Sequence, residues 1–252
     1  MSIRTVVDFN GDGVVDIKDL LHLIDRWGQA DPRCDIGPMP WGDGIVDKND
    51  LEVLMSHWGE EPGLIARWKL DEASGIVAAD SVGTGDGVLV GNPIWQTSGG
   101  KVSGALLLDG VDDHIEMPFV LDPAGGPFSV FAWVKDGGPG QVILSQEKGA
   151  DWLMVTPDGA LKTALKGSGR LDRVLASAAL IVDDAWHRVG FVWGGSNRIL
   201  YVDDVEVAMD TSSNLTSFTG GLHIGAGSRL SAGSFWSGLI DDVRIYNRAV
   251  RP

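Results

Sequence analysis

Acidic side chains in the first sixty residues recur at spacings that suit metal coordination. Counted from Asp8, side-chain oxygens fall at positions 1, 3, 5, 9 and 12 of a twelve-residue loop: Asp8, Asn10, Asp12, Asp16 and Asp19. Val14 at position 7 offers its backbone carbonyl, and Gly13 at position 6 permits the left-handed turn that closes such a loop. Calcium takes six to eight oxygen ligands, so the spacing predicts a calcium-binding loop.

The pattern returns 31 residues later, where segment 42–59 matches segment 11–28 in register. The second copy keeps an acid at positions 5, 9 and 12 and a carbonyl at position 7, supplied by Asp43, Asp47, Asp50 and Ile45. An internal repeat of this quality indicates a duplicated supersecondary unit.

Positions 1 and 3 of the second copy depart from the pattern, because Met39 and Trp41 have no oxygen that suits calcium. Two interpretations stay open. In one the loop is expanded and Asp35 reaches the ion. In the other the loop is metal-free and is held by the cluster of Pro38, Pro40 and Trp41.

Each loop must be positioned by the element that follows it. Leu20, Leu23, Ile24 and Trp27 have helical spacing and precede Gly28, which predicts a helix over 20–27. Two loop–helix repeats with aspartate at position 12 resemble a dockerin module, and the resemblance implies a calcium ion in each loop and a cohesin-like partner. Positions 10 and 11 of the loops, which help to select that partner, are Ile17 and Lys18, then Lys48 and Asn49. These pairs differ from each other and from the usual hydroxyl pairs, so the helices could instead pack on the following domain or self-associate.

The charge balance excludes several classes of protein. The 252 residues include 35 acidic and 20 basic side chains, a formal charge of −15, which opposes binding to nucleic acids or anionic lipids. No run approaches the ~20 apolar residues of a membrane helix, so we expect no membrane insertion. Cys34 is the single cysteine and forms no internal disulfide. The sequence begins without the apolar core of a signal peptide, and we expect a piece of a longer secreted or cell-surface bacterial protein.

Beyond the polar linker at 59–63, short apolar runs alternate with turns rich in Gly, Asp and Pro. About a dozen strands at intervals of roughly 8–15 residues predict an antiparallel β-sandwich. The expected strands are 66–70, 87–90, 105–108, 114–117, 128–135, 141–146, 152–156, 162–165, 187–193, 199–202, 221–224 and 239–246.

Several segments appear in the order of a LamG-like jelly roll, among them G-A-L-L-L-D-G-V-D-D-H-I-E-M-P (104–118), F-S-V-F-A-W-V-K (128–135) and L-I-D-D-V-R-I-Y-N-R-A (239–249). The chain therefore resembles the concanavalin A-like lectin/glucanase superfamily over residues ~65–250. The resemblance implies that the first and last strands are neighbours. It also implies a structural calcium near the L-D-G and I-D-D turns, with candidate ligands Asp109, Asp112, Asp113, Asp241 and Asp242.

Catalytic motifs are missing from this sequence. Glycosidases of the superfamily carry E-x-D-x-x-E, which has no match here, and the pair Asp204 and Glu206 is better explained by a hairpin turn at 203–204. His114, Glu116 and Glu147 are the remaining candidates for acid–base chemistry. We therefore expect a binding protein rather than an enzyme.

Aromatic side chains provide the candidate sugar platform, because the C–H faces of sugars stack on aromatic rings. The candidates are Phe131, Trp133, Trp152, Trp193, Tyr201 and Trp236.

These observations predict a mainly β protein with a small α-helical dockerin-like module at 1–62 and a jelly roll at 63–252. The predicted function is calcium-dependent, non-catalytic binding of a polysaccharide or other glycan. Two alternatives stay open: a glycan-cleaving enzyme of the same fold, and an adhesion or scaffold module that binds protein through its helices.

Overall fold

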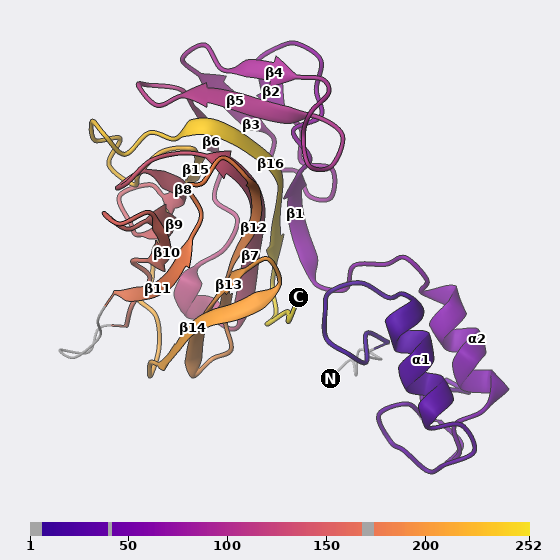
Figure 1. Cartoon of the computed structure of the whole chain (residues 1–252). Helices are drawn as coiled ribbons and strands as arrows, with labels where there is room; N and C mark the ends of the chain where they lie inside the picture. The colour runs from indigo at the N-terminus through magenta and orange to yellow at the C-terminus, as the bar shows by residue number, and fades with distance from the viewer. Residues whose placement is uncertain (1–6, 40–41, 168–173) are drawn as a thin grey trace. The chain divides into compact units, whose positions relative to one another are not determined.

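The computed structural model describes residues 7–39, 42–167 and 174–252, which form two compact units (Figure 1). The first unit comprises residues 1–63 and 250–252, and the second comprises residues 64–249. Among the described residues, no helix has both the length and the apolar character needed to cross a membrane.

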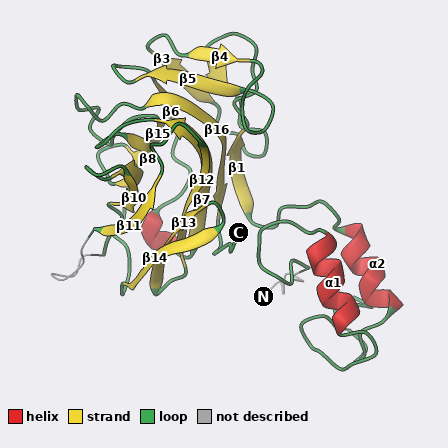
Figure 2. Ribbon diagram, in the orientation of Figure 1, coloured by secondary structure: helices red, strands yellow, loops and turns green. Residues whose placement is uncertain are grey.

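The first unit contains two loop–helix repeats (Figure 2). The helices are α1 (Ile17–Asp25) and α2 (Lys48–Ser56). Asp16 and Asp19 form a capping box at the start of α1, and their counterparts 31 residues later form the same box at the start of α2. A capping box satisfies backbone N–H groups of the first turn. For this reason α1 begins earlier than apolar spacing alone predicts.

Backbone hydrogen bonds join the two repeats with internal symmetry. Val46 exchanges bonds of 2.8 and 2.9 Å with Gly28 and Gln29, and Val15 exchanges two bonds of 2.9 Å with residues 59 and 60. The residues that follow each helix are thus hydrogen-bonded to the loop of the other repeat, and both repeats contribute to one small core. Its buried members are Val7, Val15, Leu23, Cys34, Ile36, Val46 and Leu54.

The second unit is a sandwich of two eight-stranded sheets. In spatial order the first sheet contains β14 (Val205–Thr211), β13 (Asn197–Val202), β12 (Trp186–Trp193), β7 (Phe128–Asp136), β16 (Ser237–Tyr246), β5 (Ala105–Asp109) and β4 (Ile94–Gln96). Off this path, β1 (Leu64–Trp68) pairs antiparallel with β16, as the resemblance implies for the first and last strands.

The second sheet contains, in order, β11 (Leu175–Leu180), β10 (Ala160–Thr163), β9 (Asp151–Val155), β8 (Val142–Gln146), β15 (Leu222–Ile224), β6 (His114–Met117), β3 (Gly87–Val90) and β2 (Val77–Ala78). The only helical segment described in this unit is a short 3₁₀ turn, η1 (Pro123–Gly125). The predicted antiparallel sandwich is confirmed.

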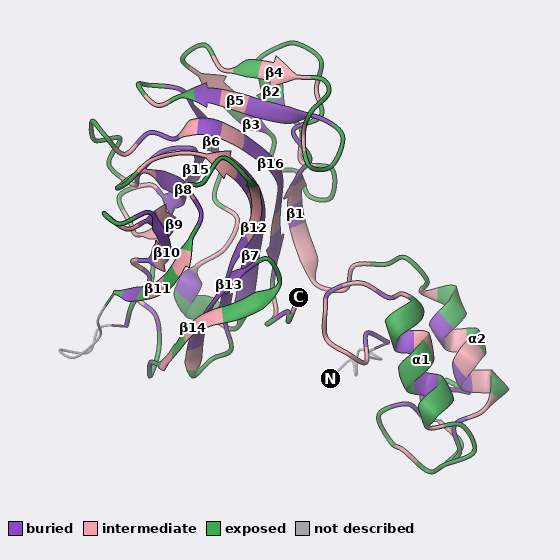
Figure 3. Ribbon diagram, viewed as in Figure 1, coloured by how far each residue is buried: buried purple, intermediate pink, exposed green. Residues whose placement is uncertain are grey.

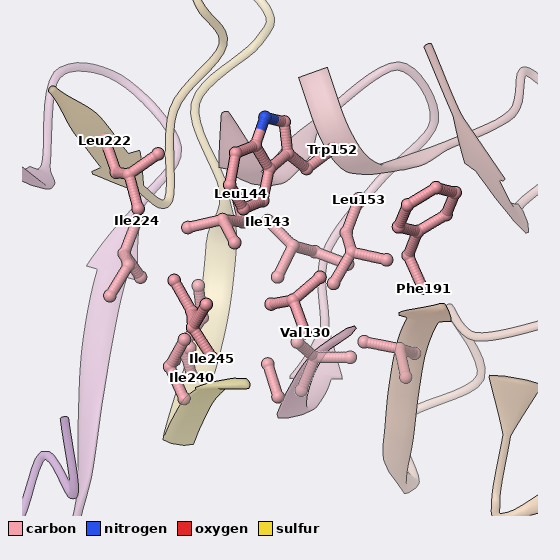
Figure 4. Close-up of a cluster of buried hydrophobic side chains, with 14 of the residues drawn as sticks. Val130, Ile143, Leu144, Trp152, Leu153, Phe191, Leu222, Ile224, Ile240 and Ile245 are labelled. Carbon is pink, nitrogen blue, oxygen red and sulfur yellow. The ribbon is translucent and has the colours of Figure 1, made fainter. Parts of the chain in front are cut away.

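The core lies between the sheets, where alternate side chains of facing strands interdigitate. Figure 4 shows Trp152 over Ile143 and Leu144, with Leu153 toward Phe191. Central strands such as β7 and β12 are largely buried, whereas the edge strand β14 is largely exposed (Figure 3).

The hairpin between β13 and β14 turns at Asp203 and Asp204, with φ of 53° and 65°. Two successive left-handed residues make the tight turn that suits the twist of an antiparallel pair. The acid at position 204 is therefore part of turn chemistry, as the sequence predicts.

Candidate functional site

The first predicted calcium loop is organised by two buried carboxylates. Asp8 accepts hydrogen bonds from the N–H groups of Gly11 (2.8 Å) and Gly13 (3.0 Å). Asp19 is fully buried and accepts from Phe9 (2.6 Å), from Asn10 (3.3 Å) and from Asp16 (2.8 Å). Both ends of the loop are thereby held around its centre.

Burial raises the pKa of Asp19, and the nearby charge of Asp8 raises it further, against the lowering effect of its backbone hydrogen bonds. Asp12 differs, because Lys18 approaches it to 2.8 Å. Burial alone would raise the pKa of Asp12, but hydrogen bonds from Lys18, Val14 and Asn10 outweigh it, so the pKa is lowered. Asp8 and Asp19 are thus two mutually repelling carboxylates of the loop, whereas Asp12 is paired with a cation.

In the second loop Asp35 has the hydrogen-bond role that Asp8 has in the first. It accepts from Asp43 N–H (3.0 Å) and from Gly44 N–H (2.8 Å), and Gly44 is the counterpart of Gly13. Asp50 accepts from the N–H groups of residues 36 and 37 at 2.6 and 2.7 Å, just as Asp19 accepts from residues 9 and 10.

This correspondence assigns the extra residues of the second loop to 38–41. Gly37 then stands where the first loop has Asn10, so the second loop offers one side-chain oxygen fewer. Ile45 keeps the place of Val14, and Asp47 caps α2 as Asp16 caps α1. Pro40 and Trp41, part of the cluster predicted for a metal-free loop, lie outside the described residues.

A third acidic cluster lies in the sandwich, in the turn between β5 and β6. The carboxylates of Asp109, Asp112 and Asp113 have oxygens within 4.8 Å of one another, a criterion that no other group of acids or histidines in the described parts of the chain meets. Asp113 is buried and accepts from Asn92 N–H (2.6 Å) and from Asp109 N–H (3.1 Å).

Asp241 does not join this cluster, which corrects the predicted ligand set. In the pairing of β5 with β16, Ser237 faces Asp109, so Asp241 lies further along the strand. Its buried carboxylate accepts from Val102 N–H at 2.7 Å. Burial raises its pKa to about 7.

Its neighbour Asp242 has cations as partners, which removes it from the predicted ligand set as well. Its carboxylate pairs with Arg67 at 2.8 Å and with Arg244 at 2.7 Å.

The predicted aromatic platform is wrong, because five of its six members are buried: Phe131, Trp152, Trp193, Tyr201 and Trp236. The three tryptophans among them belong to the core between the sheets. Phe131 lies beneath the Arg188 guanidinium, 4.8 Å from its ring centre. Trp133 is half-buried, and Lys101 stands 4.7 Å over its ring. Burial thus closes five of the six rings to a sugar, and a cation covers one face of the sixth.

A hollow of about 400 Å³ lies instead on the second sheet, beside β8 and β9. We call it the Phe218 hollow. Its principal polar and aromatic lining residues are Asp151, Lys166, Phe218, Ser228, Arg229, Ser231 and Ser234. They come from β9, from the segment after β10 and from the two loops that flank β15.

Packing and hydrogen bonds hold these loops in place. Gln146 donates to the carbonyls of Phe218 (3.2 Å) and Gly220 (3.1 Å), and Asp122 accepts from Phe218 N–H (3.1 Å). The ring lies close to Gly149, where a Cβ would come within 2.8 Å of it. A half-buried aromatic ring is therefore fixed at the wall of the hollow, beside polar side chains.

Ser228 and Arg229 also line a neighbouring hollow of about 480 Å³, here called the His223 hollow. Glu116 and Glu147 lie in this second hollow, so the structure brings together two of the predicted acid–base candidates. Lys148 hydrogen-bonds Glu147 at 2.6 Å and lowers its pKa. A general acid needs a raised pKa, so Glu147 is unsuited to that role.

Sequence reasoning missed Phe218, Lys166 and Arg229. The available signals were an aromatic residue alone in the turn-rich segment T-S-F-T-G-G and a single arginine within G-A-G-S-R-L-S-A-G-S. Binding residues lie disproportionately on loops that a rigid scaffold positions.

The second unit belongs to the class of antiparallel β-sandwiches, in which two sheets pack face to face, and its first and last strands, β1 and β16, pair with each other. A family model described as the concanavalin A-like lectin/glucanases superfamily matches residues 109–252, and the chain belongs to that superfamily. No curated protein matches this chain significantly.

Solved structures share the fold at low sequence identity. Domain 4 of an extracellular GH43 arabinanase from Geobacillus stearothermophilus, in complex with arabinotriose, is 20% identical with a TM-score of 0.56, over 74% of this chain and 93% of that domain. The binding domain of a paraclostridial mosquitocidal protein has a TM-score of 0.62 at 11% identity, over 75% of this chain and 49% of its own. The Trypanosoma rangeli sialidase has a TM-score of 0.56 at 16% identity, over 92% of this chain and 36% of the sialidase.

Proposed function

We propose that the sandwich binds carbohydrate in the Phe218 hollow without cleaving it. The main support is the fixed ring of Phe218, which lines the hollow together with hydroxyl groups and one carboxylate. These polar groups belong to Ser228, Ser231, Ser234 and Asp151. Sugars need this combination of a flat apolar surface and convergent polar groups. The arabinotriose complex of the arabinanase domain and the N-acetylneuraminic acid complex of a botulinum neurotoxin domain support a sugar ligand for this fold.

Binding is tested by calorimetric titration of the full chain with a panel of oligosaccharides, followed by product analysis. Phe218→Ala is expected to weaken binding by about tenfold or more, which corresponds to about 1.4 kcal/mol. Phe119→Ala is the matched control, because Phe119 is 49% exposed and does not line the hollow. Equal affinities of the two variants would refute the assignment, and release of shorter sugars would show catalysis.

The first unit is proposed to bind calcium through both loops. In the first loop the donors are Asp8, Asn10, Asp12, Asp16, Asp19 and the carbonyl of Val14. In the second they are Asp35, Asp43, Asp47, Asp50 and the carbonyl of Ile45. An all-oxygen set suits a hard cation, which would also relieve the repulsion between Asp8 and Asp19. Asp109, Asp112 and Asp113 offer a further calcium site in the sandwich.

Thermal melts in calcium and in chelator test this proposal. A thousandfold excess of calcium over its dissociation constant stabilises by about 4 kcal/mol. Asp19→Asn is expected to reduce the calcium-induced shift, while Asp25→Asn, on the exposed side of α1, is expected to retain it. Titration of sugar in chelator tests whether carbohydrate binding itself depends on calcium.

Docking of a protein on α1 is a second candidate function, favoured by an exposed apolar stripe. Ile17, Leu21 and Ile24 lie on one helix face and are 54%, 59% and 53% exposed. Their counterparts on α2 are Lys48, Glu52 and Met55, so only the first helix offers such a face. Cohesin domains are the partners to test, and Leu21→Glu is expected to abolish any interaction that Glu52→Leu leaves intact.

A further inference from the structure

We infer that the Phe218 hollow selects sugars that carry a carboxylate, as uronic and sialic acids do. The inference rests on the proposed carbohydrate-binding function and names the class of ligand. It is carried by two cationic side chains, Lys166 and Arg229, that line the same hollow in a strongly acidic protein.

Several other cations of the sandwich pair with neighbouring carboxylates. Lys148 pairs with Glu147 at 2.6 Å, and Arg188 pairs with Asp204 at 2.6 Å. Lys166 and Arg229 are exposed and form no ion pair with any residue in the described part of the chain. Their charges are therefore available to a ligand.

Among the described residues, Asp151 is the one acidic residue that lines the Phe218 hollow. One of its oxygens accepts the Ser228 N–H at 2.8 Å and fixes the loop that presents Arg229. The described lining of the hollow therefore has two positive charges, on Lys166 and Arg229, and one negative charge, on Asp151. This positive excess contrasts with the formal net charge of −15 of the whole protein.

The hollow offers the ligand two kinds of contact, an aromatic ring for stacking and cationic groups for a carboxylate. Phe218 offers its ring to the C–H face of the sugar, whereas Arg229 can grip a carboxylate with two parallel N–H groups. Lys166 adds a compact ammonium charge to the same hollow. A neutral sugar keeps the stacking contact and loses both charged ones.

The probes are pairs that differ in charge alone: oligogalacturonate against its methyl ester, and sialyllactose against lactose. Calorimetric titration of the full chain is expected to give at least about tenfold tighter binding to one acidic member than to its neutral partner. The affinity for that acid should fall as salt is raised, because screening weakens exposed charges. The two pairs distinguish a uronic from a sialic acid ligand.

Arg229→Gln and Lys166→Gln are each expected to remove most of the preference for the acid, so that the acidic and neutral members of the pair bind with similar affinity. Lys69→Gln is the matched control, since Lys69 is exposed and lies outside the hollow. Equal binding of acidic and neutral sugars, with Phe218→Ala still harmful, would overturn this inference and leave the proposed function standing. Absence of binding to every sugar would overturn both.

Discussion

The effect of replacing Asp241 with asparagine on the free energy of unfolding is expected to become more favourable as the pH rises. The carboxylate of Asp241 is fully buried, and its Oδ1 has no hydrogen-bond partner among the described residues. Burial, with the nearby charges of Asp242 and Asp71, raises its pKa from 3.8 to about 7, although backbone N–H groups act against the shift. The folded protein therefore holds a proton on this group that the unfolded chain releases.

The sign follows from linkage between protonation and folding. The protonated form of Asp241 is favoured in the folded protein. Its contribution to stability is complete below pH 3.8, the pKa in the unfolded chain, and is lost as the pH rises to the folded-state pKa of about 7. The full shift is equivalent to about 4 kcal/mol, of which about 3 kcal/mol lies between pH 5 and pH 8. In D241N the side-chain amide places N–H donors where Oδ1 of Asp241 has no hydrogen-bond partner among the described residues. A buried donor without an acceptor costs about 1–3 kcal/mol of stability, and this cost is the same at every pH.

Urea denaturation of both proteins at pH 5 and pH 8, in saturating calcium, measures the effect. The difference in unfolding free energy between D241N and the unmodified protein is expected to rise by about 3 kcal/mol between these pH values. Asp158→Asn, in an exposed turn, is the control and is expected to act equally at both. An equal effect of D241N at both pH values would refute the reasoning.

Three further substitutions test the sandwich. Burial alone would lower the pKa of His187, but hydrogen bonds of 2.8 Å to Asp183 and Asp203 outweigh burial and raise the pKa. The protonated imidazole therefore stabilises the fold, and this stabilisation is lost as the pH rises through the raised pKa. His187→Gln should therefore lower the melting temperature more at pH 6 than at pH 9, and calorimetric scans showing equal losses would contradict this. Trp152→Ala is expected to cost about 3–5 kcal/mol in urea denaturation, and Trp152→Phe less, because the indole N–H has no partner among the described residues. Asp242→Asn leaves two arginines without their carboxylate and is expected to cost about 3–5 kcal/mol in the same assay; a loss below about 1 kcal/mol would show that the pairs are weak.

The strands that sequence reasoning missed share one property. They are β2, β4, β11 and β14, the outermost strands of the two sheets. An edge strand pairs on one side only and buries less apolar surface, so its alternation is weak. In L-A-S-A-A-L, for example, β11 has little intrinsic preference for a strand and forms because β10 pairs with it.

The aromatic platform failed for a related reason. Alternation shows that Trp152 and Met154 lie on one face of β9, but their exposures differ, with Trp152 fully buried and Met154 half-buried. The register between β8 and β9 shifts at two places, so which side chains enter the core depends on the neighbouring strand. Such shifts leave no trace in the pattern of a single strand.

The sequence by itself determined the features whose parts lie close together along the chain. The first acidic loop spans twelve residues and the second spans sixteen, from Asp35 to Asp50. Their capping boxes and left-handed glycines follow from residue type and spacing, as at Gly13 with φ of 99°. The Phe218 hollow was decided by tertiary structure alone. Asp151, Lys166, Phe218 and Arg229 come together because the strands between them pair in a nonsequential order, and only the packed sheets fix that order.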